Sequence, residues 1–194
     1  MADLRDPNAI VTFLRELRTV RRFRLGAIPR RVVEDILEVA RWSGSAMNLQ
    51  PWEFVVVWDR RTLEDLFRLE GYAGHLAGGA VGIVLVMAWE RIEQETFDEG
   101  RVSERISLAA AAHGVAAAAH GVGSSVGWFA RGGRDAAKKT LGVPPERPVR
   151  TAISLGYREE TPPPGRPKLR QGRKPLSGMI HEDRYGQGPP DGQT

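Results

Sequence analysis

The chain has 194 residues, of which 41% are hydrophobic and 27% charged, a composition typical of one globular domain with a sizeable core. It has no cysteine, which excludes disulfides, thiolate catalysis and cysteine metal sites. The formal net charge of +4 is compatible with nucleic acid or a small anionic ligand, while no apolar run approaches the ~20 residues of a membrane span.

The first half of the chain shows alternating helical and strand patterns. Apolar residues at helical spacing predict a first helix, and Pro29 suits the first turn of a second. Asp59 is a typical N-cap for a third helix. The N-terminus carries acids and lacks the apolar region of a signal peptide, so we expect a cytoplasmic protein. In order, we expect a helix over 9–18, a helix over 30–43, a strand over 53–58, a helix over 59–72 and a strand over 80–88.

The second half begins with an alanine-rich stretch typical of a helix that packs closely on a neighbour. We expect this helix over 98–123, ending near Gly121, and explain Asp98 and Glu99 at its start by the helix dipole. "GVGSSVG" is interpreted as a helix stop and turn, and "SSVGWF" as a short strand or turn. A helix over 134–143 and a strand over 147–157 follow. Strands separated by helices indicate an α/β or α+β sandwich.

Motifs for self-contained catalysis are absent from the sequence. There is no GxGxxG after a strand, no GxxxxGK[ST] and no nucleophile elbow. His113 and His120 lie seven apart on one predicted helix, but no HExxH or carboxylate partner accompanies them, so we expect no metal site. Either a cofactor carries a reaction, or the protein catalyses none.

Six segments in order resemble the FMN-dependent nitroreductase family. "WSGSAMNLQPWEFVVVWD" is similar to the family's "aPSxxNxQPWxFvvv", and "LRTVRRF" to its "RRSxRxF". The others are "IPRRVVEDILEVARW", "DEGRVSERISLAAAAHGVAAAAHGVG", "KKTLGVP" with "TAISLGY", and "GRKPLSGMIHEDRYG". The resemblance runs from about residue 11 to residue 186.

The resemblance implies an α+β fold: a three-layer sandwich with a central, mainly antiparallel sheet flanked by helices, in an intertwined homodimer. It implies one FMN-binding domain over 1–186, in which the proline-rich stretch 158–186 is a C-terminal arm. Composition favours an extended arm there, and we expect 187–194 to be disordered. The arm would lie across the partner subunit.

The family pattern also implies which residues bind the FMN phosphate. Arg18, Thr19 and Arg21 match the "RSxR" positions, and Arg173 matches the basic position near the C-terminus. Arginine suits a phosphate because its planar fork donates two parallel hydrogen bonds. Arg21 would also lie near N1 and O2 of the flavin, where negative charge develops on reduction.

The ring would be held by two further segments. Ser45, Ala46 and Asn48 fall in the "PSxxN" segment, which in the family reaches the flavin of the other subunit. A second set runs alongside the ring, with a backbone N–H of one of its last two members facing flavin N5: Val126, Gly127 and Trp128.

Several positions depart from the family pattern. Leu17 stands where many members have their first arginine, Gly44 replaces a proline, and "GYAGHLAGGA" lacks the asparagine and lysine that some members aim at the pyrimidine edge. We interpret Gln50 as holding its loop through backbone hydrogen bonds. Three tryptophans could line the pocket or belong to core or interface: Trp42, Trp52 and Trp128.

The resemblance predicts an oxidoreductase that uses NAD(P)H and non-covalent FMN to reduce nitro compounds, quinones or enones by ping-pong hydride transfer. No side chain need act as a catalytic base and no metal is expected. The partners would be a second copy of the chain and a small-molecule acceptor. Three alternatives stay open: a flavin destructase or dehalogenase of the same fold, a non-catalytic flavin-binding module, and, ranked last, a nucleic-acid-binding protein, because no recognised motif supports it.

Overall fold

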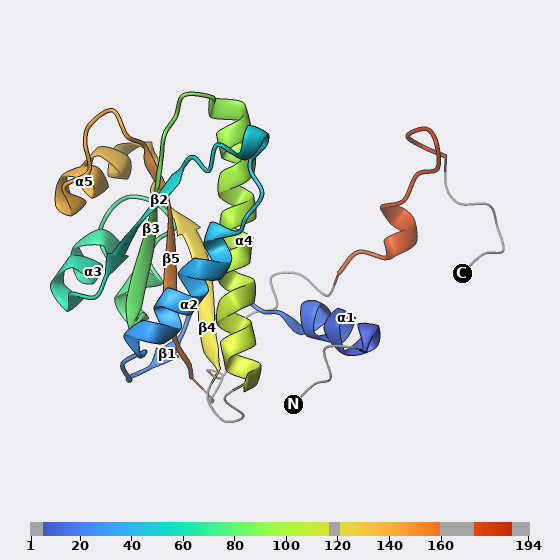
Figure 1. Ribbon diagram of the computed structural model, residues 1–194, viewed down its shortest axis with the longest axis horizontal. Helices are drawn as coiled ribbons and strands as arrows, with labels where there is room; N and C mark the ends of the chain where they lie inside the picture. Colours follow the sequence, from blue (N-terminus) through green and yellow to red (C-terminus); the bar gives the residue numbers. More distant parts are fainter. Residues whose placement is uncertain (1–5, 117–120, 160–172, 188–194) are drawn as a thin grey trace. The chain divides into compact units, whose positions relative to one another are not determined.

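The computed structural model describes residues 6–116, 121–159 and 173–187, and Figure 1 shows the arrangement of the elements. The chain divides into two compact units, Met1–Glu160 and Thr161–Thr194. The helices are α1 (Pro7–Glu16), α2 (Arg30–Arg41), α3 (Arg60–Phe67), α4 (Ile92–Ala116) and α5 (Arg131–Leu141), and the strands are β1 (Phe23–Arg24), β2 (Trp52–Val57), β3 (Val81–Met87), β4 (Val122–Trp128) and β5 (Val149–Arg158). In the second unit the described part contains a short 3₁₀ helix, Leu176–Gly178.

The sheet is built around β5. This ten-residue strand pairs with β4 on one side and with β3 on the other, and β2 follows β3 at the edge. The two-residue strand β1 pairs with the end of β5 at Tyr157 and Arg158. Every pairing is antiparallel, which confirms the expected α+β class with a mainly antiparallel sheet.

Helices cover both faces of the sheet, which gives three layers (Figure 1). On one face α2 and α4 bury a cluster that includes Ile36, Ile106 and Ile153. On the other face α3 and α5 close a second cluster around Leu63 and Phe129. β3 is buried along its whole length, as expected for a central strand.

Local sequence explains the shorter helices. Asp59 is extended and accepts the Thr62 N–H at 2.8 Å, which begins α3 as predicted. Gly142 lies in the left-handed region (φ 66°) and ends α5, since glycine adopts this conformation without steric strain. The first helix begins earlier than expected, at Pro7, after the N-cap Asp6.

The predicted start of α4 at Asp98 is wrong. The helix begins at Ile92, because the Glu95 carboxylate accepts the N–H groups of Trp89, Glu90 and Arg91 and so caps the start from within. Asp98 is therefore in the second turn and only 2% exposed, so a helix-dipole explanation does not apply. The predicted end near Gly121 cannot be compared, because 117–120 lie outside the described residues.

β4 is longer than the sequence suggested. It starts at Val122, inside the segment interpreted as a helix stop and turn, and runs for seven residues in register with β5. β1 was not predicted at all. Across the ranges that the structure describes, none of the helices is both long and apolar enough to pass through a bilayer.

Candidate functional site

The outer edge of β4 is the edge that does not face β5. The Phe129 N–H donates to the Arg150 carbonyl of β5 at 2.8 Å. Because backbone groups alternate in direction along a strand, the N–H and C=O groups of Gly127 also point to β5, while those of Ser124, Val126 and Trp128 point outward. Of the two amides expected to face a flavin N5, the Trp128 amide therefore points outward and the Gly127 amide does not.

Two chain segments bond to the ends of this outer edge. The Val20 N–H donates to the Ser124 carbonyl at 2.8 Å, and the Tyr72 N–H donates to the Trp128 carbonyl at 2.7 Å. Between them, the N–H and C=O groups of Val126 have no hydrogen-bond partner in the described parts of the chain. The Val126 side chain is 39% exposed. Val126 thus offers both an outward donor and an outward acceptor to a planar ligand, and the outward N–H groups of Ser124 and Trp128 also have no hydrogen-bond partner among the described residues.

An aromatic pair stands at one end of the open position. The rings of Tyr72 and Trp128 have centroids 4.6 Å apart at an interplanar angle of 42°, and both side chains are substantially exposed. Exposed aromatic pairs offer a surface on which a flat ring can stack. The sequence indicated Trp128 but not Tyr72.

On one face of the sheet, β4 presents only small residues. Gly123, Ser125 and Gly127 alternate along β4 on one face of the sheet, and their β5 partners are also small: Gly156, Ser154 and Ala152. We refer to these six residues as the small-residue patch. It allows chain segments to approach the sheet closely, because a Cβ at Gly123 would lie 2.7 Å from Val20 and one at Gly156 would lie 2.5 Å from Phe23.

His75 lies against this patch. Its Nδ1 is 2.7 Å from the Ser154 Oγ, and its Nε2 is buried without a partner among the described residues. A Cβ at Gly127 would lie 2.4 Å from that Nε2. Partial burial and, to a smaller extent, the positive charge of Arg21 together lower the pKa of His75 from 6.5 to about 4. The structure therefore brings Arg21, His75 and Gly127 into one region.

The predicted phosphate residues of the N-terminal segment lie next to this region. Arg18, Thr19 and Arg21 flank the bonded Val20 and are exposed, whereas Val20 is buried. The Nη1 atom of Arg18 donates to the carbonyls of Arg15 and Leu17, both at 2.7 Å. Arg173 is exposed in the second unit, so its position relative to Arg18 is not described.

The loop with the predicted ring contacts packs on α4. The Ala46 N–H donates to Asp98 Oδ2 at 3.0 Å, and the Gln50 N–H donates to Ser45 Oγ at 2.9 Å. The Gln50 Nε2 donates to the Asn48 carbonyl at 3.3 Å, which agrees with the structural role expected for this residue. Asn48 itself is exposed. The loop is therefore bonded to α4, whereas the arginine segment is bonded to β4 through Val20.

The tryptophans separate into core and surface. Trp52 is 7% exposed and belongs to the core, so it does not line the site. Trp42 is 69% exposed and donates its Nε1 hydrogen to Glu38 at 3.0 Å.

The Nε2 atom of His113 lies 3.8 Å from the Oδ2 atom of Asp35, and within the described ranges no three side chains form a metal-binding group.

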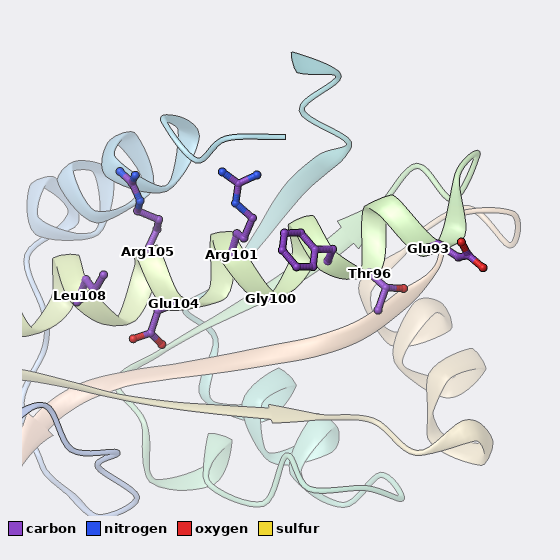
Figure 2. Close-up of a pocket in the computed structure, with 8 residues that line it drawn as sticks. Glu93, Thr96, Gly100, Arg101, Glu104, Arg105 and Leu108 are labelled. Carbon is purple, nitrogen blue, oxygen red and sulfur yellow. The ribbon is translucent and has the colours of Figure 1, made fainter. Parts of the chain in front are cut away.

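The exposed face of α4 carries a shallow hollow (Figure 2). One helix supplies all of its lining, so the hollow is an exposed helix face and not an enclosed cavity. Its residues are Glu93, Thr96, Phe97, Gly100, Arg101, Glu104, Arg105 and Leu108. None of the predicted site residues lines it.

Comparison with known proteins identifies the family. The model of the nitroreductase family matches residues 14–157, most of the chain. The chain belongs to the nitroreductase family. This family of oxidoreductases is the one that the six sequence segments indicated.

Two curated relatives support the assignment of the chain to the nitroreductases. A protein of Archaeoglobus fulgidus with the provisional name NADH dehydrogenase/NAD(P)H nitroreductase is 30% identical over 131 residues, 64% of this chain and 71% of that protein. An NADH dehydrogenase of Thermus thermophilus is 38% identical over 68 residues, but this match covers only 35% of this chain and 33% of that protein.

Solved structures of nitroreductases share the fold. An FMN-dependent nitroreductase of Clostridium difficile has a TM-score of 0.73 at 22% identity and covers 90% of this chain and 99% of its own. The NADPH:FMN oxidoreductase of Vibrio harveyi, solved with NAD⁺, also has a TM-score of 0.73, at 19% identity, covering 91% of this chain and 78% of its own. These likenesses confirm the sandwich fold of this nitroreductase.

Proposed function

We propose that this nitroreductase binds FMN without a covalent bond and uses NAD(P)H to reduce small organic acceptors. The observation that carries the proposal is the open backbone position at Val126. It lies between two carbonyls that are bonded to other chain segments, beside an exposed aromatic pair and close to a cluster of arginines. A flat heteroaromatic ring with a phosphate tail needs these three features together.

FMN would supply the hydride chemistry, accepting hydride at N5 from NAD(P)H and delivering it to the acceptor. The residues of the chain would bind and orient. The outward amide of Val126, or that of Trp128, would donate to N5. Arg21 would place its positive charge at the pyrimidine edge and favour the reduced ring. The half-buried, neutral His75 would pack behind the strand.

The phosphate would be held by Arg18 and Thr19 together with Arg173. Replacing Arg18 or Arg173 by alanine should weaken FMN binding about tenfold or more, since a charge-assisted hydrogen bond contributes roughly 1.5–3 kcal/mol. Riboflavin lacks the phosphate, so its affinity should change little. An equal loss for both ligands would contradict the phosphate assignment.

The working unit would be a homodimer in which Ser45, Ala46 and Asn48 of one subunit reach the flavin of the other. The exposed side chains of α1 support a partner, because this helix buries none of its residues and exposes Ile10, Val11 and Leu14. Light scattering of the full chain tests this proposal, which a monomer that retains FMN would exclude. A cytoplasmic location stays a prediction.

The first test is direct. Purified protein supplied with FMN should turn yellow, release FMN on heating and bleach when NADH or NADPH is added without oxygen. Nitroarenes, quinones and enones should then restore the colour to different extents and so rank the acceptors. Protein that stays colourless at micromolar FMN would overturn the proposal.

The second test removes one backbone N–H group. Val126→Pro deletes the outward N–H without breaking a bond to β5, and proline is tolerated at the outer edge of an edge strand. Val126→Ala is the matched control, because it keeps the amide. We expect weaker FMN binding and a changed flavin spectrum in the proline variant only, in protein with an unchanged circular dichroism spectrum.

A further inference from the structure

The loop between α2 and β2 has an unusual backbone. Met47, Asn48 and Gln50 all lie in the left-handed region, with φ of 51°, 56° and 49°. Residues other than glycine adopt this conformation uncommonly, and asparagine tolerates it best. Three such residues within four positions persist only where the surroundings hold them in place, and such clusters are common at functional sites.

A buried carboxylate provides one of these restraints. Asp98 is 2% exposed in the second turn of α4, and its Oδ2 accepts the N–H of Ala46, the residue that opens the short 3₁₀ helix Ala46–Asn48. A hydrogen bond to an ionised acceptor is roughly twice as strong as a neutral one. The bond joins residues 52 positions apart, so it fixes the loop to α4 and not to its own neighbours in sequence.

Arg101 adds a second restraint from the same helix. Its Nη1 lies 3.4 Å from Asp98 Oδ1. Its guanidinium occupies the space beside Gly44, where an added Cβ would lie 2.2 Å from the Arg101 Nη2. Figure 2 shows Arg101 leaving α4 on the same side as Arg105, while Glu104 leaves on the opposite side. Glycine at position 44 thus gives the guanidinium room to pack against the loop, and a larger residue there would make this flexible side chain shift.

The neighbouring residue on α4 serves a different purpose. Glu99 is also 2% exposed, but its carboxylate pairs with Arg150 of β5 and so fixes α4 to the sheet. Adjacent residues of a helix point in directions about 100° apart, so one carboxylate faces the loop and the other the sheet. Glu99 is thus a matched control for Asp98, with the same charge, burial and helical turn.

We propose that Asp98 and Arg101 are positioning residues that hold the loop 44–50 in the shape needed to contact the cofactor. The proposal deepens the proposed function, because it rests on Ser45, Ala46 and Asn48 contacting FMN. Asp98 acts through the backbone at Ala46, and Arg101 acts by packing on Gly44. The left-handed backbone at Met47 and Asn48 then directs the Asn48 side chain outward without reorganisation when the ligand binds.

The central experiment measures amide hydrogen exchange of residues 44–50 in the flavin-free protein. Asp98→Ala should accelerate exchange in this loop about tenfold, since it removes a charge-assisted hydrogen bond. Asp98→Asn keeps an acceptor oxygen of the same shape and should restore most of the protection. Glu99→Gln should lower the melting temperature without accelerating exchange in the loop.

A second readout measures FMN and riboflavin affinity in the same variants. Asp98→Ala should weaken both ligands by a similar factor of about ten, because the loop contacts the ring and not the phosphate. Asp98→Asn should bind both more tightly than Asp98→Ala does. Glu99→Gln should bind both as the unaltered protein does at temperatures where it is folded.

The outcomes separate this inference from the proposed function. If the unaltered protein binds no FMN, the proposed function fails, and the exchange measurement still decides whether Asp98 holds the loop. If loop exchange is unchanged in Asp98→Ala, or rises equally in Glu99→Gln, the positioning role is excluded. Should Asp98→Ala not fold, Arg101→Ala takes its place, with Arg105→Ala on the same side of α4 as the control. Equal loop exchange in these two variants would exclude the positioning role as well.

Discussion

The apolar cluster under α2 and α4 and the small-residue patch, which lie on opposite faces of the sheet, are closed by different means. On the face of α2 and α4, large apolar side chains such as Ile36, Ile106 and Ile153 fill the space between helix and sheet. Over the small-residue patch, the sheet contributes almost no side-chain volume, and chain segments around Val20 and His75 approach the strands themselves. Helix packing requires volume from the sheet, whereas close backbone approach requires its absence.

The largest effect should come from removing side-chain volume from the cluster under α2 and α4. Ile106→Ala removes a fully buried side chain and should lower the free energy of unfolding by about 4 kcal/mol, because the cavity cannot collapse between a helix and a sheet. Urea unfolding measures this loss. Ile106→Val, which removes one methylene, should cost only about 1 kcal/mol. Equal losses in the two variants would mean that the face repacks freely.

The small-residue patch should be destabilised by the opposite change, which is the addition of a side chain. Gly127→Ala places a Cβ 2.1 Å from the Tyr72 carbonyl oxygen, a backbone atom that cannot move without breaking the bond to Trp128. We expect a loss of about 3 kcal/mol in unfolding free energy. Gly100→Ala on the exposed side of α4 is the control, since a Cβ there meets nothing and should stabilise the helix by up to about 1 kcal/mol.

Acid should destabilise the patch specifically. The pKa of His75 is about 4 in the folded protein and near 6.5 when unfolded, so the unfolded chain binds the extra proton between these values. The resulting stability is fully present above about pH 6.5 and is lost as the pH falls toward 4. We expect His75→Gln to remove about 1–2 kcal/mol of pH dependence after allowing for solvent screening.

Urea unfolding at pH 7.5, 6 and 5 measures this effect as the difference between the unaltered protein and His75→Gln. All other titrating groups cancel in that difference. A difference that does not change with pH would show that His75 titrates normally in the folded state.

The smallest effect tests whether the close approach is specific. Gly123→Ala would clash with the Val20 side chain at 2.7 Å, and Val20→Gly would remove that side chain. In a double-mutant cycle the two changes should be less harmful together than their sum by about 1 kcal/mol. Additive losses would mean that the segment at Val20 shifts freely along the strand edge.

The same contrast explains what the sequence could predict. Strong local signals decided the helix-covered parts: the apolar periodicity of α2 and the N-cap Asp59 of α3 both predicted elements that the structure confirms. β4 was underestimated because glycine and serine give no hydrophobic alternation, and its strand character comes from pairing with β5. The start of α4 was misplaced because Glu95 caps the helix from inside it.

Of the candidate site, the sequence predicted the loop residues and the arginines through motif resemblance, and their roles remain predictions. It missed Tyr72 and His75, since no local pattern marks a segment that becomes important only by crossing a distant strand. It placed the amide that faces flavin N5 at Gly127 or Trp128 and could not choose between them, because the direction of an amide depends on the register between β4 and β5.

The position of β5 in the chain bears on how the protein folds during synthesis. This strand is the last of the sheet in sequence, yet β1, β3 and β4 all pair with it. Until it leaves the ribosome, β2 and β3 can pair only with each other, and the backbone N–H and C=O groups along the other edge of β3 stay unpaired. Nascent chains that stop before Val149 should therefore be sensitive to protease and prone to aggregate, and protection should appear abruptly once β5 is complete.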